Sequence, residues 1–365
     1  MKKYEELMKR CISLAKKAKG QVSPNPLVGA VIFDDDFNII SEGYHQRYGC
    51  CHAEVNAVNS ANCDLKEKSI IVNLEPCSHY GKNPPCADLI IKKGFKKVVI
   101  GMVDPNPLVA GKGILKLQEA GIEVITGILE DECKKLNEVF IKNHLEKKPF
   151  ITIKTATTLD GKIATSTGSS KWITCEKSRQ YVQKLRNDYH AILTSSSTVI
   201  KDNPSLNCRL KNGKNPVRII LDTNLKTSPE HNVYKNDATR VIIAVKNDIE
   251  DTKIKKFPKN IEFIKCNLKD EHIDLEELFN KLYEEKITSI LVEAGSILTS
   301  AIIKENLADK LIQFIAPKIT GDSFAISFVS GFKIENINDS IGLVGLSTKK
   351  LGTDIMTESY FPKNI

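Results

Sequence analysis

The stretch SIIVNLEPCSHYGKNPPCADLIIKKGFKKVVIGMVD, residues 69–104, holds two β-branched apolar runs with an amphipathic segment between them. Residues 69–77 and 96–104 predict buried strands, and residues 84–94, which end at a glycine, predict a helix. A helix that connects two buried strands indicates a parallel pair. This stretch therefore predicts a layered α/β domain.

The same alternation of strands and helices continues on both sides of this stretch. The expected elements are a helix over 1–20, a hairpin over 27–45, helices over 52–61 and 111–121, a strand over 122–128 and a polar helix over 131–148. A fresh β-branched run, PFITIKTATTLDGKIA, begins at Pro149. We therefore place a domain boundary at 145–150, which gives domains 1–147 and 148–365.

The second half of the chain repeats the pattern and predicts a second α/β domain. Its expected strands cover 189–199, 216–223, 240–246 and 261–266, followed by a helix over 275–286 and a strand, turn and helix over 289–307.

The composition fits a globular protein, with 365 residues, 41% hydrophobic and 27% charged. The net charge of +8 divides into 21 basic and 19 acidic residues before Lys148, and 32 and 26 from there on. Neither half has the dense basic stripe that nucleic-acid binding requires, so no such partner is expected. No apolar run approaches the ~20 residues that cross a bilayer, and the opening segment is charged, so we expect a soluble cytoplasmic protein without membrane contact.

Ten scattered cysteines indicate thiols, metal ligands or nucleophiles and not a disulfide framework. His52, Cys77 and Cys86 provide three ligands of the kind that hold a catalytic zinc with one open position, and Glu54 adds a carboxylate outside this set. Cys86 follows two prolines at an expected helix N-terminus, where the dipole favours a thiolate. Cys50 and Cys51 lie beside His52 in the sequence, and we interpret both as residues without a role in the metal site.

H-x-E followed by P-C-x-x-C is the known signature of zinc deaminases that act on nucleobases. Eight residues separate Cys77 from Cys86 here, where that signature has two. With this longer spacing, and with PNPLVGA at 24–30 and GYHQRYGCCHAE at 43–54, the chain resembles the pyrimidine deaminase of riboflavin biosynthesis. The resemblance implies a cytidine-deaminase-like αβα domain with one zinc per chain and Glu54 as the proton shuttle. It also implies Asn25 on the pyrimidine edge, and His45 and Lys82 near the ribose phosphate.

The second half carries TLDGKIA (158–164), SSKWIT (169–174), HAILTSSSTVIKDNPSLNCR (190–209), ILDT (220–223) and VEAGSILTSA (292–301). In this order they resemble the reductase of the same pathway, which has a dihydrofolate-reductase-like α/β fold and uses NADPH. The resemblance implies that the NADPH site is lined by Ala156, Trp172, Thr198, Asp202, Thr223, Gly295, Ser296, Ile297, Leu298, Thr299, Ser300 and Ala301. The positions implied for substrate are Ser170, Arg186, Leu206, Arg209 and Glu293.

Several of these positions make physical sense. Gly295 precedes an expected helix, whose first N–H groups can bind a pyrophosphate, although a plain β-to-α turn has the same pattern. The planar forks of Arg186 and Arg209 suit a phosphate monoester, and structural ion pairs are the alternative. Lys154 and Asp202 are candidate proton donors.

The sequence thus predicts a bifunctional enzyme of riboflavin biosynthesis, expected to be a homo-oligomer that acts on phosphorylated pyrimidines. It would deaminate 2,5-diamino-6-(5-phosphoribosylamino)pyrimidin-4-one and then reduce the ribosyl group of the product. A tRNA or nucleotide deaminase with an accessory domain would have to explain the eight-residue insert and the near-neutral first half. A non-catalytic module with a structural zinc would have to explain the acid at Glu54.

Overall fold

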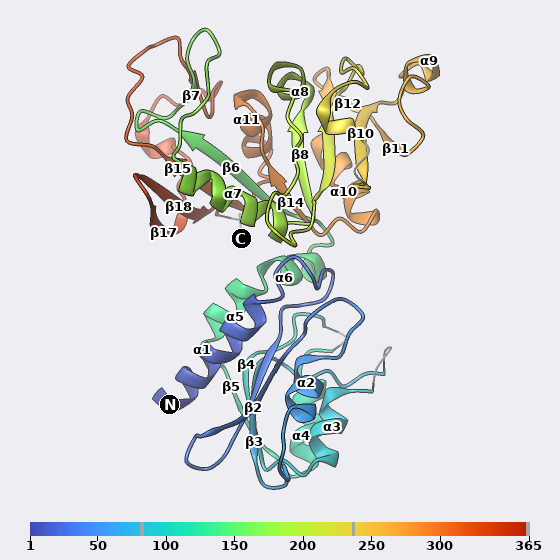
Figure 1. Ribbon diagram of the computed structural model, residues 1–365, viewed down its shortest axis with the longest axis vertical. Helices are drawn as coiled ribbons and strands as arrows, with labels where there is room; N and C mark the ends of the chain where they lie inside the picture. The colour runs from blue at the N-terminus through green and yellow to red at the C-terminus, as the bar shows by residue number, and fades with distance from the viewer. Residues whose placement is uncertain (81–83, 108, 236–237, 363–365) are drawn as a thin grey trace. The chain divides into compact units, whose positions relative to one another are not determined.

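A computed structural model describes residues 1–80, 84–107, 109–235 and 238–362 of the chain. They form two compact units, Met1–Lys147 and Lys148–Ile365, which we call the N-terminal and the C-terminal unit (Figure 1). In these described ranges, no helix is both long and apolar enough to cross a bilayer.

The N-terminal unit is built on a five-stranded sheet with the order β2-β1-β3-β4-β5. Its strands are β1 (Gly29–Phe33), β2 (Ile39–Tyr44), β3 (Ser69–Leu74), β4 (Lys97–Met102) and β5 (Glu123–Thr126). The β1–β2 hairpin is antiparallel and β1 pairs antiparallel with β3, whereas β3, β4 and β5 run parallel, as the strand–helix–strand pattern predicts.

Helices cover both faces of this sheet (Figure 1). They are α1 (Lys2–Lys16), α2 (Ala53–Asn59), α3 (Cys86–Lys92), α4 (Lys112–Glu119), α5 (Glu130–Leu136) and α6 (Glu138–Leu145). The apolar stripe of α1 packs on β1 and β3, and it approaches so closely that a Cβ at Gly29 would collide with the carbonyl of Cys11. Because both faces are covered, every residue of β3 is buried.

The prediction of a single polar helix over 131–148 is wrong in one respect, because the structure divides this segment into α5 and α6 at Asn137. Asn137 has left the helical conformation, with φ −107° and ψ 22°. Its side chain bonds the backbone of Leu27 instead, donating to the carbonyl at 3.0 Å and accepting from the N–H at 2.8 Å. The helix break therefore follows from a contact 110 residues away in the chain.

The C-terminal unit is built on a nine-stranded sheet with the order β11-β10-β9-β8-β14-β6-β15-β18-β17. Its strands are β6 (Phe150–Thr157), β8 (Ala191–Ser195), β9 (Val217–Leu221), β10 (Val241–Lys246), β11 (Ile261–Cys266), β14 (Ser289–Val292), β15 (Lys310–Ile315), β17 (Val344–Leu351) and β18 (Asp354–Tyr360). The first seven in this order are parallel, and β18 joins β15 in antiparallel fashion. Short strands pair as β7 (Lys162–Ala164) with β16 (Ile326–Ser327), and β12 (Leu268–Lys269) with β13 (His272–Ile273).

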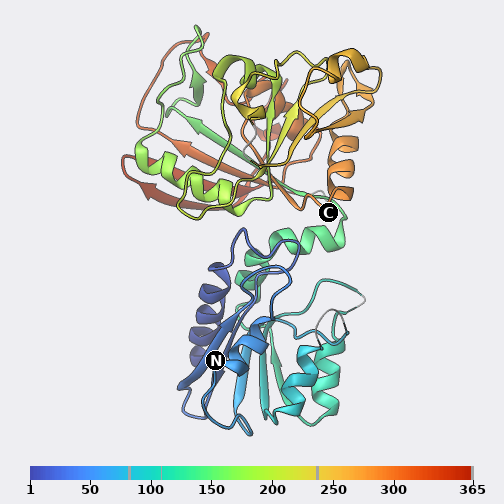
Figure 2. The same ribbon diagram turned by 45° about the vertical axis from the view of Figure 1, so that its right-hand side comes forward.

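Helices pack on both faces of the nine-stranded sheet, which crosses the unit between them (Figure 2). They are α7 (Glu176–Asp188), α8 (Ser196–Asp202), α9 (Asp251–Ile254), α10 (Leu275–Glu284) and α11 (Ser296–Lys304), with short 3-10 turns η1 (Asn232–Tyr234) and η2 (Ile337–Asp339). The apolar residues of α10 and α11 join one core with Ile151 and Ile153 of β6. The strand expected over 189–199 is too long, because Ser195 caps the N–H of Thr198 and starts α8.

Candidate functional site

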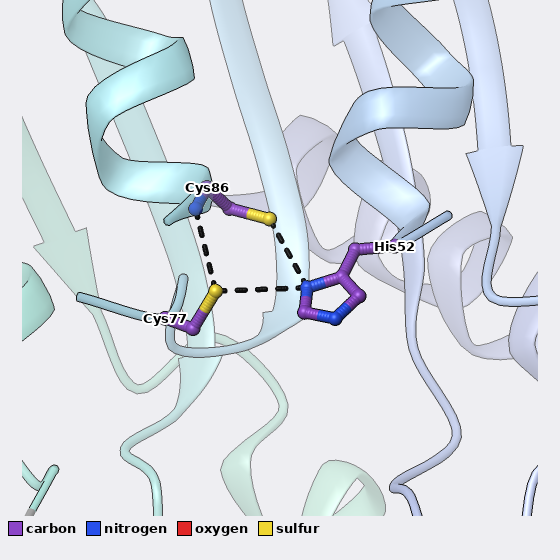
Figure 3. Close-up of side chains that lie close together, drawn as sticks. All are labelled: His52, Cys77 and Cys86. Carbon is purple, nitrogen blue, oxygen red and sulfur yellow. Dashed lines mark hydrogen bonds between the residues drawn. The ribbon is translucent and has the colours of Figure 1, made fainter. Parts of the chain in front are cut away.

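The side chains of His52, Cys77 and Cys86 converge at the carboxyl end of β3 (Figure 3). His52 occupies the position before the first residue of α2, Cys77 follows β3, and Cys86 is the first residue of α3. The ligand atoms of all three lie within 4.8 Å of one another. Nδ1 of His52 faces both sulfurs, at 3.3 Å from Cys86 and 3.6 Å from Cys77. The ligand atoms thus come from the starts of two helices, α2 and α3, and from the segment that follows β3.

The two thiols of this cluster hydrogen-bond each other, and this contact shifts their pKa values in opposite directions. Hydrogen bonding from the Cys86 thiol lowers the pKa of Cys77 to about 4. The Cys86 backbone N–H also donates to Cys77 Sγ at 3.3 Å, so the N-terminus of α3 acts on the neighbouring sulfur. The pKa of Cys86 itself is raised, because its thiol bonds Cys77 and because it is buried.

Glu54 lies in the first turn of α2 and is 3% exposed. Burial raises the pKa of Glu54 to about 7, and the nearby charge of Cys77 adds to the effect. A carboxyl group whose pKa is close to neutrality can both take up and release a proton, which is what general acid–base catalysis requires.

The residues present fit a zinc ion. One imidazole nitrogen and two cysteine sulfurs are donors that zinc prefers. These three form the metal-ligating cluster that the structure contains within its described residues. Cys50 and Cys51 are exposed and lie outside it.

Asn25 and His45 contact each other, with Asn25 Nδ2 at 3.1 Å from His45 Nε2. The other ring nitrogen of His45 lies 3.0 Å from the carbonyl of Cys51, and the His45 and His52 rings are 5.8 Å apart. Burial lowers the pKa of His45, which favours the neutral form of its ring. The structure therefore joins His45 to Asn25 inside the protein, and the third expected substrate residue, Lys82, lies outside the described residues.

Two asparagines that the sequence analysis did not single out hold the segment that carries Asn25. Asn73 accepts a bond from the Gly29 N–H at 2.7 Å and donates to the Leu27 carbonyl at 2.9 Å, and Asn137 bonds Leu27 as described above. A polar side chain in the middle of the apolar run SIIVNL was the available signal for Asn73.

A third missed residue is Glu75, which is 3% exposed and lies two residues before Cys77. Its carboxylate accepts the backbone N–H groups of Asp104, Gly111, Gly113 and Ile114, at 2.9 to 3.3 Å. Gly113 approaches so closely that a Cβ there would collide with the Pro76 carbonyl. Glu75 therefore ties the chain before a zinc ligand to the loop that follows β4.

In the C-terminal unit, the residues expected at the cofactor, apart from Trp172, lie at or beyond the carboxyl ends of four adjacent strands, β9, β8, β14 and β6. Thr223 lies two residues after β9, Thr198 and Asp202 lie in α8 after β8, Gly295–Ala301 form the turn after β14 and the start of α11, and Ala156 is near the end of β6. The carboxyl edge of a parallel sheet is the usual place for a ligand in an α/β fold.

The start of α11 fits the pyrophosphate of a dinucleotide such as NADPH. Gly295 provides no side-chain cap, so the first N–H groups of this nine-residue helix keep their capacity to bind an anion. A Cβ at Gly295 would meet no atom of the described residues within 4 Å, so a ligand can approach the backbone there.

Glu293, which follows β14, forms ion pairs with Arg186 and Lys154. Arg186 donates from Nε and Nη2 to its two carboxylate oxygens at 2.9 and 3.0 Å, and Lys154 Nζ lies 3.4 Å from Oε2. Burial raises the pKa of Glu293, but the charges of Arg186 and Lys154 outweigh it and bring the value to about 2. The guanidinium fork expected to bind phosphate is thus already engaged by Glu293.

Arg209 differs from Arg186. Its side chain is exposed, its backbone N–H bonds Gln183, and within the described residues its guanidinium has no ion-pair partner. Its neighbour Leu206 is buried, with a positive φ of 49°.

Ser170 and Trp172 lie in the segment between β7 and α7. Ser170 is half-buried, whereas the Trp172 ring is 64% exposed, with the Arg179 guanidinium 4.9 Å from its centroid. An exposed indole that rests on an arginine remains available for stacking.

Comparisons with known families assign both units. Residues 1–102 match the cytidine and deoxycytidylate deaminase zinc-binding region, and residues 149–357 match the RibD C-terminal domain.

The chain also aligns with curated relatives over nearly its whole length. The chain is 42% identical to the riboflavin biosynthesis protein RibD of Actinobacillus pleuropneumoniae, with 97% of this chain and 94% of that protein covered. It is 36% identical to RibD of Escherichia coli, with 96% and 97% covered.

Two solved structures are similar to this chain over nearly its whole length. A deaminase/reductase from Thermotoga maritima, described as a diaminohydroxyphosphoribosylaminopyrimidine deaminase and 5-amino-6-(5-phosphoribosylamino)uracil reductase, is 42% identical, with a TM-score of 0.86 and 99% of each chain covered. RibD of Acinetobacter baumannii is 34% identical, with a TM-score of 0.87 and 99% of each chain covered. The chain therefore belongs to the RibD family of riboflavin biosynthesis, bifunctional enzymes that join a zinc-dependent deaminase of cytidine-deaminase-like fold to an NADPH-dependent reductase of dihydrofolate-reductase-like fold.

Proposed function

We propose that domain 1–147 hydrolyses the exocyclic amine of 2,5-diamino-6-(5-phosphoribosylamino)pyrimidin-4-one, and that domain 148–365 reduces the ribosyl group of the product to ribityl. The observation that carries the first half is a buried carboxyl group, Glu54, beside the three-residue cluster of His52, Cys77 and Cys86. The substrate names printed for the Thermotoga maritima structure support both halves.

In the deaminase, His52, Cys77 and Cys86 hold the zinc, which when bound polarises a water molecule and lowers its pKa. Glu54 takes one proton from the attacking water as its oxygen bonds to the ring carbon that carries the amino group. Glu54 passes this proton to the adjacent ring nitrogen and then carries the remaining hydroxyl proton to the departing amine. The C–N bond breaks, ammonia leaves and a carbonyl remains. Glu54 is 3% exposed, so it is largely shielded from bulk water.

In the reductase, the residues Ala156, Trp172, Thr198, Asp202, Thr223 and Gly295–Ala301 would bind NADPH, which when bound supplies a hydride. The hydride goes to C1′, the C1′–O4′ bond breaks, and O4′ takes a proton. Ser170, Arg186, Leu206, Arg209 and Glu293 would line the substrate site, where Arg209 would bind the phosphate while Arg186 stays paired with Glu293. Of the two candidate proton donors, we favour Lys154, because it is largely buried beside Glu293 whereas Asp202 is exposed.

We propose that the chain forms a homo-oligomer in the cytoplasm and has no nucleic-acid partner. Exposed apolar residues gather before and on β17, the last strand of its sheet, and an unpaired edge with apolar side chains favours a second copy of the chain. They include Ile337, Ile341, Leu343, Val344 and Leu346. Sedimentation of wild type and Leu346→Glu tests this, and a monomeric wild type would contradict it.

One preparation tests the whole proposal. Zinc-loaded protein should release ammonia from the phosphoribosyl diaminopyrimidinone, and should oxidise NADPH when given the deaminated product. Ammonia release from cytidine or from tRNA, without turnover of the proposed substrate, would contradict it.

A further inference from the structure

His45 is placed between two groups that together determine its protonation pattern. Its Nδ1 lies 3.0 Å from the Cys51 carbonyl, and its Nε2 lies 3.1 Å from Nδ2 of Asn25. The ring is 3% exposed, and it meets the His52 ring nearly edge-on, with 75° between the planes. His45 thus lies between Asn25 and a residue of the zinc cluster.

The tautomer follows from the chemistry of these partners. A carbonyl oxygen only accepts hydrogen bonds, so the proton of the neutral ring must be on Nδ1, where it is donated to Cys51. Nε2 then carries a lone pair and accepts. The Asn25 amide must therefore turn its NH2 group toward His45, because its oxygen in that place would face another lone pair.

The backbone around this contact is held as well. The His45 N–H donates to the Val28 carbonyl at 3.0 Å, and the Asn25 N–H donates to the Val22 carbonyl at 2.8 Å. Both residues are therefore fixed to the same segment, which Asn73 and Asn137 hold from the other side. A rigid backbone leaves the amide plane of Asn25 to be set by its bond to His45.

We propose that His45 is a positioning residue that orients the Asn25 amide so that its Oδ1 accepts an N–H of the pyrimidine. The amide is planar, so fixing Nδ2 against His45 directs Oδ1 away from it, and no group in the described part of the chain bonds that oxygen. An oriented acceptor selects the N–H edge of the ring and rejects an edge that offers a lone pair. This role rests on the proposed deaminase function, and it is separate from contact with the ribose phosphate.

The tautomer is tested on the unaltered protein. Nitrogen-15 NMR of zinc-loaded wild type with labelled histidine distinguishes a protonated ring nitrogen from a bare one. We expect His45, assigned by loss of its signals in a variant, to be protonated on Nδ1 alone. A proton on Nε2 of the neutral ring would overturn the proposal, whatever the enzyme assays give.

A matched pair of variants tests the function. His45→Gln can place its amide oxygen where Nε2 lies and still accept from Asn25, whereas His45→Asn can reach only the Cys51 carbonyl. We expect His45→Asn to lower kcat/KM for ammonia release about tenfold and His45→Gln to restore most of it. Gln46→Asn, at the exposed neighbouring position, is the control, and zinc content and NADPH oxidation report folded protein.

Two further measurements separate this role from a phosphate contact. In an Asn25→Ala background, His45→Asn should have little additional effect, since the residue it positions is gone. The effect of His45→Asn should also persist with the dephosphorylated riboside. Additive losses, or a loss confined to the phosphorylated substrate, would overturn the proposal. If the wild-type protein released no ammonia, the proposed deaminase function would be wrong. The NMR measurement would still test the tautomer of His45 independently.

Discussion

Arg186 and Glu293, 107 residues apart in the chain, meet in a two-bond ion pair at 2.9 and 3.0 Å. Lys154 joins them from β6, so one buried carboxylate balances two cations. A buried charge without a partner lowers stability. The ion pairs of Glu293 with Arg186 and Lys154 should therefore affect the free energy of unfolding as well as substrate binding.

Glu293→Gln should destabilise the C-terminal unit by about 3–5 kcal/mol at pH 7, since it leaves Arg186 and Lys154 buried without their counter-charge. The pKa of Glu293 lies below its ordinary value of 4.5, at about 2. Its contribution is therefore complete above pH 4.5 and is lost as the pH falls toward 2. Denaturant titrations at several pH values should show that the difference in free energy of unfolding between wild type and Glu293→Gln becomes smaller as the pH falls through this range. Glu262→Gln, which breaks a more exposed pair with Arg240, should cost about 1 kcal/mol or less.

Arg209→Ala should lower kcat/KM for reduction about tenfold or more, because its exposed guanidinium lacks an internal ion-pair partner among the described residues and is available to a phosphate. Ammonia release should stay at the wild-type rate, and Lys259→Ala, another exposed cation, should alter neither activity. An equal loss of both activities in folded, zinc-loaded Arg209→Ala would contradict the assignment of Arg209 to a separate reductase site.

Cys77→Ser should abolish stoichiometric zinc, because it removes the sulfur whose pKa is lowest in the cluster. Elemental analysis per chain is the measurement, and Cys63→Ser, at an exposed thiol outside the cluster, should keep about one zinc. Full zinc content in Cys77→Ser would remove Cys77 from the ligand set.

Glu54→Gln should retain zinc yet lose ammonia release by about 10²- to 10⁴-fold, the usual effect of a positioned acid–base group. Reduction of the deaminated substrate should continue. Glu119→Gln, at the exposed end of α4, serves as the matched control. Ammonia release within a few-fold of wild type in Glu54→Gln would exclude Glu54 as the proton shuttle.

Glu75→Ala should destabilise the N-terminal unit by about 2–4 kcal/mol, since it leaves several backbone N–H groups without the acceptor that now satisfies them. Glu75→Gln should cost less, because one amide oxygen still accepts. The free energy of unfolding, measured with zinc present and with zinc chelated, shows whether the effect depends on the metal. Equal stability of Glu75→Ala and wild type would contradict this role.

The sequence predicted the strand and helix order of the N-terminal unit, and it predicted the strands β8 to β11 with α10, β14 and α11 in the C-terminal unit, because these patterns are local. It also grouped His52, Cys77 and Cys86, each of which follows or starts such an element. The sequence did not predict α7, β15, β17 or β18. It did not predict the break at Asn137, the start of α8 at Ser196 or the role of Glu75. Asn137 and Glu75 act through contacts 29 to 110 residues away, which no local periodicity reports.

The contact between Asn137 and Leu27 links the segment that carries Asn25 to a part of the chain outside the matched deaminase region. That match ends at residue 102 and includes His52, Cys77, Cys86 and Glu54. However, the segment that carries Asn25 is bonded by Asn137, which lies after residue 102 at the junction of α5 and α6. A fragment cut after residue 102 would retain every group that binds the metal while losing support for the loop that presents Asn25.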